Sequence, residues 1–435
     1  MSEKIIRDPV HDVIAFRLDR DLDALLFRLL AAPEIQRLRR IRQLGMASLA
    51  YPGADHSRYS HSLGVMETAR KALDQLAHSF TIDQEGRAVC TVAALLHDLG
   101  HGPFSHVFER VSGIHHEEIT RRVILDPDSG VHQVLLDHDR ALPAKIVAFL
   151  RCEPRRTFFC DIISSQLDAD RFDYLLRDNL MTGSRYGGFD LEWVLHALTI
   201  DQSCDRLAVH AKGISAVETY LQARFNMYRN VYFHKVVRSA EGMVKLALQR
   251  AKRLAVQRRL EWPRPGDGVY KALLGQQMSM AEFGDTDDVS VMHSFKLWSH
   301  GADPVLAALC KGLLFRRVYK SIDLSRFQDP KDARAARTAV ERMIADAGGE
   351  PGYEMFYDQP AGSGYETFAG GEDDDGCGGG VNEILVKQTD GKLTPFASIS
   401  PLSQALNRQL QFRRLHVAPA WRDRAEQIVR ATSGG

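Results

Sequence analysis

The chain has 435 residues, of which 44% are hydrophobic and 26% charged, as in an ordinary soluble globular protein with room for more than one domain. Its 56 Lys and Arg equal its 56 Asp and Glu, so no global basic field favours nucleic acid or an anionic membrane, and any anion site must be local. Six scattered cysteines without a CxxC pair indicate reduced thiols and a cytoplasmic protein, and we expect neither a signal peptide nor a membrane span.

Helical periodicity dominates from about residue 20 to residue 345 and predicts a largely α-helical body. The expected helices cover residues 21–30, 32–44, 61–80, 87–99, 116–125, 161–180, 216–252 and 304–320. Short strands are predicted at residues 13–18, 206–209 and 384–388.

Composition divides the chain into three predicted parts. Residues 1–345 form the helical body, and the candidate metal site lies within residues 55–180. Residues 346–381 are rich in glycine and acidic side chains, and we expect a flexible loop there because ordering glycine costs much entropy. Residues 382–435 predict a short α+β C-terminal extension, a strand pair followed by a helix, which is too small to fold alone and should pack on the body.

Histidines concentrate in one stretch, since eight of the 17 lie between positions 56 and 116. An apolar helical run ends in His97 and Asp98, and His61 and Asp170 lie near the heads of two other predicted helices. Two imidazoles and two carboxylates suit iron, manganese, zinc or magnesium better than calcium, and they leave positions open for water and a phosphate oxygen. Each residue alone could be a helix cap or a satisfied core polar group, but the four together favour a catalytic metal site.

A second histidine group follows Gly100. Pro103 suits the first turn of a new helix, which places His106 and Glu109 on one side at i, i+3. The next helix opens on two histidines and Glu117, and we expect the first of them, His115, on the surface. The group supplies candidates for phosphate contact and for a general acid near neutral pH.

Two further helices carry polar side chains at i, i+4, i+8 spacing. Asp170, Tyr174 and Asp178 share one face of the first, which we interpret as half-buried in a cleft; the alternative is a solvated helix with Asp173–Arg177 pairs. The second helix carries an arginine suited to phosphate and two tyrosines that could shape a pocket, or it is an amphipathic core helix. Its residues are Arg224, Tyr228 and Tyr232. Arginines within residues 37–42 are a solvated face or a second nucleotide or nucleic-acid surface.

With these motifs in place, the chain resembles the HD-domain deoxynucleoside triphosphate triphosphohydrolases, in the branch typified by the SAM-and-HD-domain enzyme. The resemblance runs from about Asp8 to Val244 and more faintly to the C-terminus. The strings that carry it are residues 36–39, 43–45, 52–54, 58–65, 97–106, 116–117, 168–178 and 232–235.

The resemblance implies an all-α HD-domain core with small β elements, and a role for each matching residue. It implies metal ligation by His61, His97, Asp98 and Asp170. Around the scissile α-phosphate it places the catalytic group His101, His106, His116, Glu117 and Glu109. Near the phosphates and in the sugar pocket it places Gln43, Leu44, Arg58, Tyr174, Asp178, Arg224, Tyr232 and Lys235, with Tyr232 leaving no room for a 2′-hydroxyl.

The implied reaction is metal-dependent hydrolysis of a dNTP to deoxynucleoside and triphosphate, by a metal-activated water that attacks the α-phosphate. The expected cofactor is manganese, iron or magnesium, with zinc as a further candidate. The implied partners are the dNTP substrate, a nucleotide effector or single-stranded nucleic acid, and further copies of the chain in a homo-oligomer.

Two alternatives stay open: an HD-type phosphodiesterase or nucleotidase acting on another nucleotide, and a nucleotide- or nucleic-acid-binding regulator with a vestigial site. The sequence also departs from the family pattern in three places. We expect no N-terminal SAM domain, and Ala31-Ala32 stands where an acidic residue would read guanine at a regulatory site. Glu109 replaces an aspartate but keeps the carboxylate.

Overall fold

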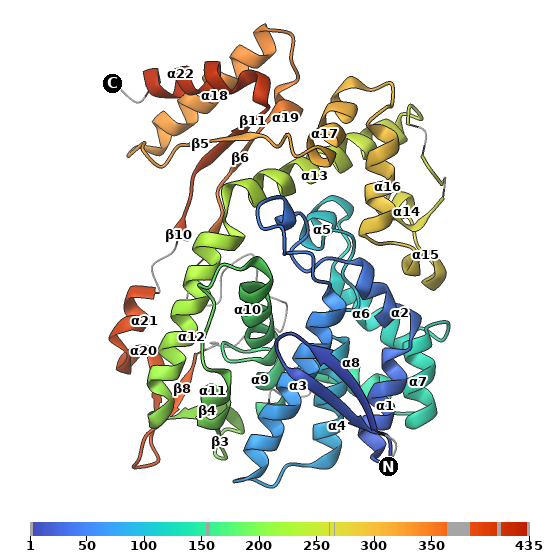
Figure 1. Ribbon diagram of the computed structural model, residues 1–435, viewed down its shortest axis with the longest axis vertical. Coiled ribbons are helices and arrows are strands. Elements are labelled where there is room, and N and C mark those ends of the chain that lie inside the picture. Colours follow the sequence, from blue (N-terminus) through green and yellow to red (C-terminus); the bar gives the residue numbers. More distant parts are fainter. Residues whose placement is uncertain are drawn as a thin grey trace.

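Helices make up most of the computed structural model, which describes residues 3–153, 157–260, 262–264, 266–362, 383–406 and 410–432 (Figure 1). The mostly helical fold with small sheets confirms the predicted fold class. Up to residue 260 the helices are α1 (Asp21–Leu30), α2 (Pro33–Arg37), α3 (Arg58–Ala77), α4 (Gln84–Leu96), α5 (His106–Ser112), α6 (His116–Leu125), α7 (Gly130–His138), α8 (Leu142–Leu150), α9 (Phe158–Ile163), α10 (Ala169–Thr182), α11 (Leu191–Ala197), α12 (Ile214–Met227) and α13 (Lys235–Val256).

The helices that carry the metal-ligand motifs pack around one large apolar core. The central helix α3 lies against both α4 and α10, and α4 lies against α8. Asp83 and Asp168 cap α4 and α10 by accepting backbone N–H groups, which starts both helices at defined residues. The hairpin β1 (Glu3–Asp8) and β2 (Asp12–Arg17) covers this core beside α1, and it buries Ile14 and Phe16 completely.

A second helical cluster surrounds the C-terminal half of α13 and has its own apolar core. Its other helices are α14 (Gly268–Leu273), α16 (Asp288–Trp298) and α17 (Pro304–Leu314), whereas the short helix α15 (Met280–Gly284) buries Met280 and Phe283 in the first core. Phe104 and Phe108, which lie on either side of His106 in the sequence, are buried in this second core. The segment around His106 therefore lies between the two helical clusters.

The remaining elements form small sheets. One has the order β3 (Leu198–Asp201), β4 (Arg206–His210), β8 (Leu385–Lys387) and β9 (Leu393–Pro395), followed by α20 (Phe396–Ile399) and α21 (Pro401–Leu406). Another has the order β5 (Lys320–Asp323), β11 (Arg414–Val417) and β6 (Met355–Asp358), and it packs with α18 (Pro330–Asp346) and α22 (Arg422–Thr432). The short strands β7 (Ala361–Gly362) and β10 (Leu410–Gln411) pair, and α19 (Pro351–Glu354) precedes β6.

Four predicted helices are shorter than expected or interrupted, and in two of them a buried side chain marks the break. The helix expected at 32–44 stops at Arg37 and continues only as a 3-10 turn, since the Arg37 side chain turns inward onto carbonyls of Leu99, His101 and Thr286. The helix expected at 161–180 is split into α9 and α10, because Asp168 accepts the N–H groups of its neighbours on both sides.

The other two helices are interrupted further along the chain. The helix expected at 216–252 is broken by a π-helical turn, η4 (Tyr228–Tyr232), and by a new start at His234. The helix expected at 304–320 ends at Leu314, and Lys320 begins β5.

The C-terminal extension draws on residues from both sides of its predicted boundary. Strand β5 and helix α18 precede residue 347, yet they pair and pack with β11 and α22. Within the stretch 346–381, predicted as a loop, α19, β6 and β7 are regular structure, and the part from residue 363 onward lies outside the described residues. Strand β8, within residues 382–435, pairs in parallel with β4.

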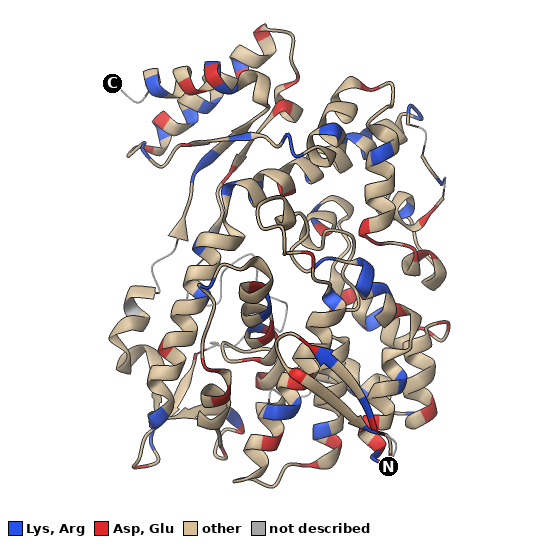
Figure 2. Ribbon diagram, viewed as in Figure 1, with Lys and Arg blue, Asp and Glu red and all other residues tan. Residues whose placement is uncertain are grey.

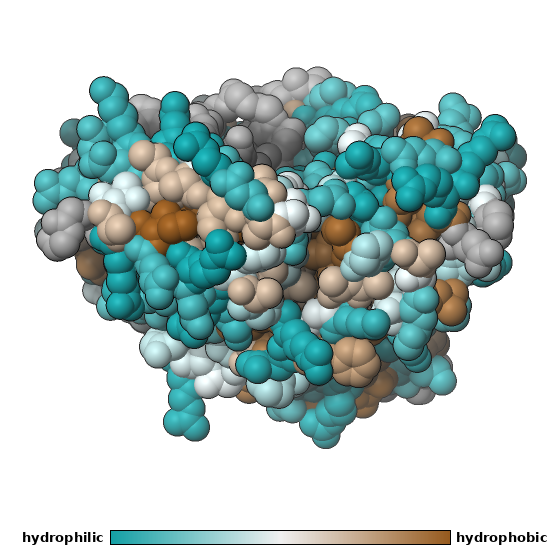
Figure 3. All heavy atoms as spheres, turned by 90° about the horizontal axis from the view of Figure 1, so that it is seen from above, coloured by the Kyte–Doolittle hydropathy of each residue, from teal (hydrophilic) through white to brown (hydrophobic). Residues whose placement is uncertain are grey.

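Charged residues are dispersed along the chain, and the described residues on the one face seen from above show no large apolar patch. Basic and acidic residues alternate along the ribbon, in keeping with the balanced composition (Figure 2). The face seen in Figure 3 is mostly hydrophilic, with small apolar clusters. Among the described residues, every helix is too short or too polar to cross a bilayer.

Candidate active site

The four predicted metal ligands come together where three helix ends meet. His61 lies in the first turn of α3, and Asp170 is the second residue of α10. Helix α4 ends at Leu96, so His97 and Asp98 stand in the turn that follows it. The sequence places these residues far apart, and the packing of α3 against α4 and α10 makes them neighbours.

The distances among the ligand atoms match those around a single small cation. His61 Nε2 lies 2.9 Å from Asp170 Oδ1 and 3.7 Å from Asp98 Oδ2. His97 Nε2 lies 3.4 Å from Asp98 Oδ1 and 3.8 Å from Asp170 Oδ1. Ligands that each bind at about 2.0–2.2 Å lie roughly 3.0–3.5 Å apart, so His61, His97 and Asp170 are spaced to share one ion. Asp98 lies beside them, with a different oxygen toward each imidazole.

His97 provides the sharpest test of whether the residues fit a metal. Its Nδ1 donates to the carbonyl of Ala94 at 2.8 Å, which leaves a lone pair on Nε2. That Nε2 atom is buried and has no hydrogen-bond partner among the described residues. A buried acceptor in this state is costly unless a donor or a cation satisfies it. The residues present therefore fit a divalent cation.

His61 is oriented by a carboxylate behind it. Its Nδ1 lies 2.9 Å from Asp173 Oδ2, which directs Nε2 toward the other ligands. Burial alone would lower the pKa of His61, but the hydrogen bonds to Asp170 and Asp173 outweigh burial and raise the pKa to about 10. A cation at this site thus takes the place of a proton on His61.

Asp98 stays ionised because cationic and polar groups surround it. Burial would raise the pKa of Asp98, but Arg58, His97 and His101 hold it well below its usual value. The Arg58 guanidinium donates to Asp98 Oδ2 and, through Nε, to Ser105 Oγ at 2.9 Å. Arg58, predicted near the phosphates, is therefore attached to both the metal centre and the loop that follows it.

The turn after Asp98 is held against α6 at Gly100. A Cβ atom on Gly100 would lie 1.8 Å from the His116 carbonyl oxygen, so only glycine permits this approach. Thr120 fixes the turn from both sides by accepting the Gly100 N–H and donating to the His97 carbonyl. The close contact brings His116, at the start of α6, next to the metal-ligand turn.

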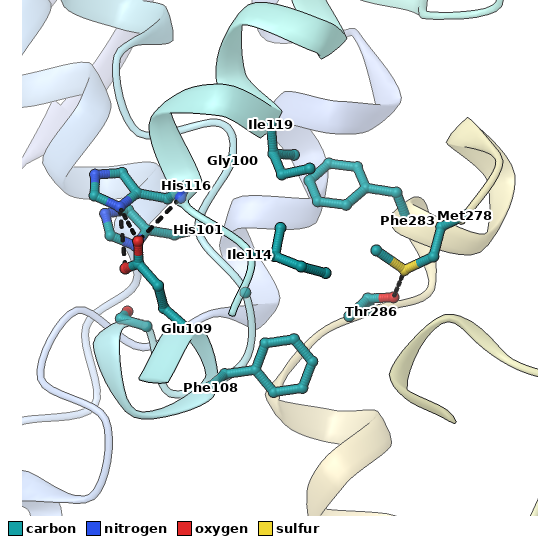
Figure 4. A pocket seen from close by; sticks show the side chains of 12 residues that line it. Gly100, His101, Phe108, Glu109, Ile114, His116, Ile119, Met278, Phe283 and Thr286 are labelled. Carbon is teal, nitrogen blue, oxygen red and sulfur yellow. Dashed lines mark hydrogen bonds and ion pairs between the residues drawn. The ribbon is translucent and has the colours of Figure 1, made fainter. Parts of the chain in front are cut away.

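The predicted catalytic histidines gather around one carboxylate. The rings of His101 and His116 stack with centroids 3.9 Å apart, and the ring of His106 stands edge-on to both. Glu109 Oε2 lies 3.2 Å from His116 Nδ1 and 3.4 Å from His106 Nδ1. Figure 4 shows His101, Glu109 and His116 on one side of a pocket, with apolar side chains of Phe108, Ile114, Ile119, Met278 and Phe283 on the other.

The members of this group differ in their charge states. Burial lowers the pKa of His101 well below its usual value, and the nearby Arg58 adds to that effect, so His101 is neutral. Burial would raise the pKa of Glu109, but His106 and His116 hold it far below the ordinary value, so Glu109 is ionised. Glu117, predicted in the same group, instead pairs with Arg121 at 3.3 Å.

The backbone between these groups is strained. Phe104 and Ser105 have φ angles of 53° and 51°, which are uncommon for side chains larger than glycine. Such residues cost on the order of 1–3 kcal/mol each and persist only where the surroundings fix them. Ser105 immediately precedes His106, the first residue of α5, so the strain lies beside one of the predicted catalytic histidines.

The residues predicted for the sugar pocket form a second polar cluster. Tyr232 donates to Asp178 Oδ2 at 2.8 Å, and His56 Nε2 lies 2.7 Å from Asp178 Oδ1. The ring of Tyr174 stands edge-on to Tyr232 with centroids 6.2 Å apart. Asp178 and Tyr174 lie on α10, as Asp170 does, so one helix joins this cluster to the metal centre.

The other predicted substrate residues have different surroundings. Arg224 is buried and donates to Gln166 Oε1 at 2.6 Å, while Lys235 is exposed at the start of α13. The Gln43 backbone N–H donates to the His56 carbonyl, and its buried Oε1 has no hydrogen-bond partner among the described residues. Leu44 packs in a small apolar cluster beside the site.

Several residues at the site had no role in the sequence analysis. They are His11, His56, Ser105, Gln166 and Asp173. The i, i+4 spacing of Asp173 and Arg177 was visible, but both side chains are fully buried, so the solvated-helix alternative is wrong. His56 belongs to the histidine-rich stretch, which could have suggested it.

Two family profiles match the chain: the HD domain over residues 58–145 and the HD associated region over residues 189–259. A Bacillus subtilis protein, YwfO, is 34% identical over 375 residues, which cover 86% of this chain and 83% of that protein. A crystal structure of a phosphohydrolase from Bacteroides thetaiotaomicron is similar with a TM-score of 0.80 and 28% identity, covering 96% of this chain and 100% of the other.

Relatives with a named activity cover less of the chain. The Dictyostelium discoideum homolog of the deoxynucleoside triphosphate triphosphohydrolase SAMHD1 is 30% identical over 63% of this chain and 54% of its own length. Human SAMHD1 is 27% identical over 57% of this chain and 44% of its own length. The chain thus spans about half the length of these relatives.

Fold, ligand set and profile matches together define a phosphohydrolase of the HD-domain class, whose members bind divalent metal ions. The chain belongs to the HD-domain family that includes YwfO and the SAMHD1 proteins.

The metal centre can be tested at Asp98. We expect Asp98→Ala to lose bound metal, because the remaining ligands cannot balance the charge of a divalent ion beside Arg58. The helical fold should survive, since α3, α4 and α10 pack mainly through apolar side chains. Metal content by elemental analysis and helicity by circular dichroism check both expectations.

Asp74→Ala is the matched control, because Asp74 is an exposed carboxylate on α3 that pairs only with Arg87 in the structure. It should keep its metal. An Asp98→Ala protein with wild-type metal content would show that the site lies elsewhere.

Proposed function

We propose that the protein hydrolyses deoxynucleoside triphosphates to deoxynucleoside and triphosphate. In this reaction water attacks the α-phosphorus, the bond from phosphorus to the 5′-oxygen breaks, and that oxygen takes up a proton. The observation that carries the proposal is a single contact, His101 Nε2 to Asp98 Oδ1 at 3.2 Å. It joins the metal ligands to the His106–Glu109–His116 group, so a phosphate on the cation would lie beside a candidate proton donor.

Three features of the chain support binding at the α-phosphate. When bound, a divalent cation supplies Lewis acidity toward the water and toward a phosphate oxygen. Arg58 orients Asp98 and adds a permanent positive charge next to the position of the phosphate. His101 is buried and neutral, and it donates its one N–H from Nε2 to ionised Asp98, so it holds Asp98 in place beside the His116 ring.

His106 is the proposed general acid. Its Nδ1 faces the ionised Glu109, which favours a proton on that nitrogen and leaves Nε2 to deliver a second proton to the 5′-oxygen. The side chain is 53% exposed, so a substrate can reach it. Glu109 then acts as the carboxylate that orients His106.

The cluster of Tyr174, Asp178 and Tyr232 is the proposed sugar site. Both oxygens of Asp178 are engaged by Tyr232 and His56, which fixes the Tyr232 ring in place. A ring fixed under C2′ excludes a ribose hydroxyl, because the hydroxyl would lose water without gaining a partner. The relatives named as deoxynucleoside triphosphate triphosphohydrolases support this choice of substrate.

A panel of four dNTPs and four NTPs, each with manganese, iron, magnesium or zinc, tests the proposal. We expect triphosphate and a deoxynucleoside from the dNTPs, and much less product from the NTPs. Release of pyrophosphate or orthophosphate, or cleavage of another phosphoester only, would favour the phosphodiesterase or nucleotidase alternative. Metal-loaded protein that binds nucleotides without turnover would favour a regulator.

His106→Ala tests the general acid. The mutant should keep bound metal and near-normal KM for a dNTP, yet lose kcat by about 10²–10⁴-fold, because the alkoxide would leave without a proton. The fall of kcat on the high-pH side, where the acid loses its proton, should disappear. Metal content, kinetics and the pH profile check these expectations.

His115→Ala is the matched control for His106→Ala. His115 Nδ1 also lies 3.1 Å from Glu109, but its side chain is 79% exposed. It should change kcat by less than about threefold. Loss of metal together with activity in His106→Ala would instead make His106 a metal ligand or a structural residue.

Tyr232 should set the preference for deoxyribose. Tyr232→Ala opens space under C2′ and removes the cost, about 1–3 kcal/mol, of placing a ribose hydroxyl against the ring. The ratio of kcat/KM for dNTP over NTP should therefore fall roughly 5–150-fold. Tyr232→Phe keeps the ring and loses only the bond to Asp178, so it should keep most of the preference. An unchanged ratio in Tyr232→Ala would assign sugar selection to other residues.

The domain boundaries and assembly belong to the same proposal. The catalytic body would end before β5, because β5 and α18 pair and pack with β11 and α22, and these C-terminal elements would support it. A homo-oligomer and a nucleotide or single-stranded nucleic-acid effector are expected from the family resemblance alone, as is a cytoplasmic location.

A further inference from the structure

A buried carboxylate outside both regions matched by the family profiles connects two parts of the active site. Asp288, the first residue of α16, is 4% exposed. Its Oδ1 accepts the Phe104 N–H at 2.8 Å, and its Oδ2 accepts the Arg42 N–H at 3.0 Å. Burial raises the pKa of Asp288 to about 6 despite these two donors. A carboxylate buried at such a cost, between two distant backbone segments, calls for a specific role.

Through Oδ1, Asp288 holds the strained turn that precedes His106, the proposed general acid. Phe104 and Ser105 both have positive φ, and His106 follows directly. The Phe104 ring is buried and stacks on Phe295, also on α16, with centroids 6.3 Å apart. Helix α16 therefore fixes Phe104 by its main chain and by its ring, which is the kind of restraint that a strained turn needs.

Through Oδ2, Asp288 holds Arg42, in the segment that leads to Arg58 and the candidate metal centre. Arg42 forms a β-bridge with Ser57, the residue before Arg58. Arg58 in turn contacts Asp98, a metal ligand, and Ser105 in the strained turn. Asp288 thus closes a ring of contacts that runs from the turn, through Arg58 and Ser57, to Arg42 and back to α16.

We propose that Asp288 is a positioning residue for catalysis, which sets the distance between the proton donor His106 and the metal centre by bracing the Phe104–Ser105 turn against the Arg42–Arg58 segment. The inference rests on the proposed function, in which His106 is the general acid. Asp288 touches no substrate and acts only through these two backbone amides.

Asp288→Asn removes one of the two acceptors, because an amide has a single oxygen and its NH₂ group opposes the second backbone N–H. The turn or the Arg42 segment should then relax and move His106 away from the leaving oxygen. Misplacement of about 1 Å costs roughly 10²-fold in rate, so we expect kcat for dNTP hydrolysis to fall about 10–100-fold with KM within about threefold. Bound metal should stay at the wild-type level.

A double-mutant comparison separates positioning from general loss of stability. If Asp288 acts through His106, adding Asp288→Asn to His106→Ala should lower kcat by less than about threefold further, because the acid is already absent. An equal fall in both backgrounds would overturn the proposal. So would loss of metal in Asp288→Asn.

Asp287→Asn is the matched control. Asp287 is also buried, lies one residue earlier, caps α16 and pairs with Arg40, but it does not contact the strained turn. The two variants lose the same charge at the same helix end. Asp287→Asn should keep kcat within about threefold of wild type, and an equal loss in both variants would show that α16 acts through charge or stability alone.

Hydrogen exchange supplies a readout that needs no turnover. Backbone amides of residues 101–108 should exchange at least about tenfold faster in Asp288→Asn than in wild type and in Asp287→Asn, because the Phe104 N–H loses its acceptor. Unchanged exchange would overturn the proposed contact. A wild-type protein that releases no triphosphate from any dNTP would instead refute the proposed function, and with it the catalytic role of Asp288.

Discussion

Asp173 is the carboxylate on which both the core and the metal centre depend. It is fully buried, and it meets the His11 ring at 2.8 Å, the His61 ring at 2.9 Å and the Arg177 guanidinium at 2.8 Å. Burial would raise its pKa, but these partners hold it well below the usual value. Asp173 therefore connects the N-terminal hairpin, α3 and α10, and it also orients His61, a candidate metal ligand.

The packing around Asp173 leaves little freedom to change it. A Cβ atom on Gly64 would lie 1.8 Å from Asp173 Oδ1, so glycine in the middle of α3 lets α10 approach closely. Arg177 also pairs with Asp8 at 2.8 Å, which ties the hairpin to α10. Breaking a buried charge network by removing one partner costs about 3–5 kcal/mol. A substitution at Asp173 would therefore affect both the stability of the core and the orientation of His61.

Sequence reasoning predicted the general helical fold and selected the candidate metal ligands, because both depend on local signals. His97 and Asp98 lie at a helix end that the apolar pattern marks, and the i, i+4, i+8 spacing of Asp170 and Asp178 indicates one helix face. The contacts that orient these groups are not local: Asp173 meets His11 across 162 positions, and Asp288 meets Phe104 across 184. Periodicity carries no information about such pairs.

The same limit explains the helix boundaries that were wrong. Nothing near Arg37 in the sequence shows that its side chain turns inward to the Thr286 carbonyl, 249 positions away, at the point where the helix stops. The π-helical turn at residues 228–232 keeps the helical spacing of polar side chains, so periodicity could not separate it from its neighbours. Tertiary contacts decided these places.

The strand order of the C-terminal sheet has a consequence for folding during synthesis. Strand β11, near the end of the chain, lies between β5 and β6 and is the pairing partner of both. Neither outer strand can complete its ladder until residue 417 has left the ribosome, whereas every candidate metal ligand has been made by residue 170. The helices that carry these residues can therefore assemble before the sheet receives its central strand.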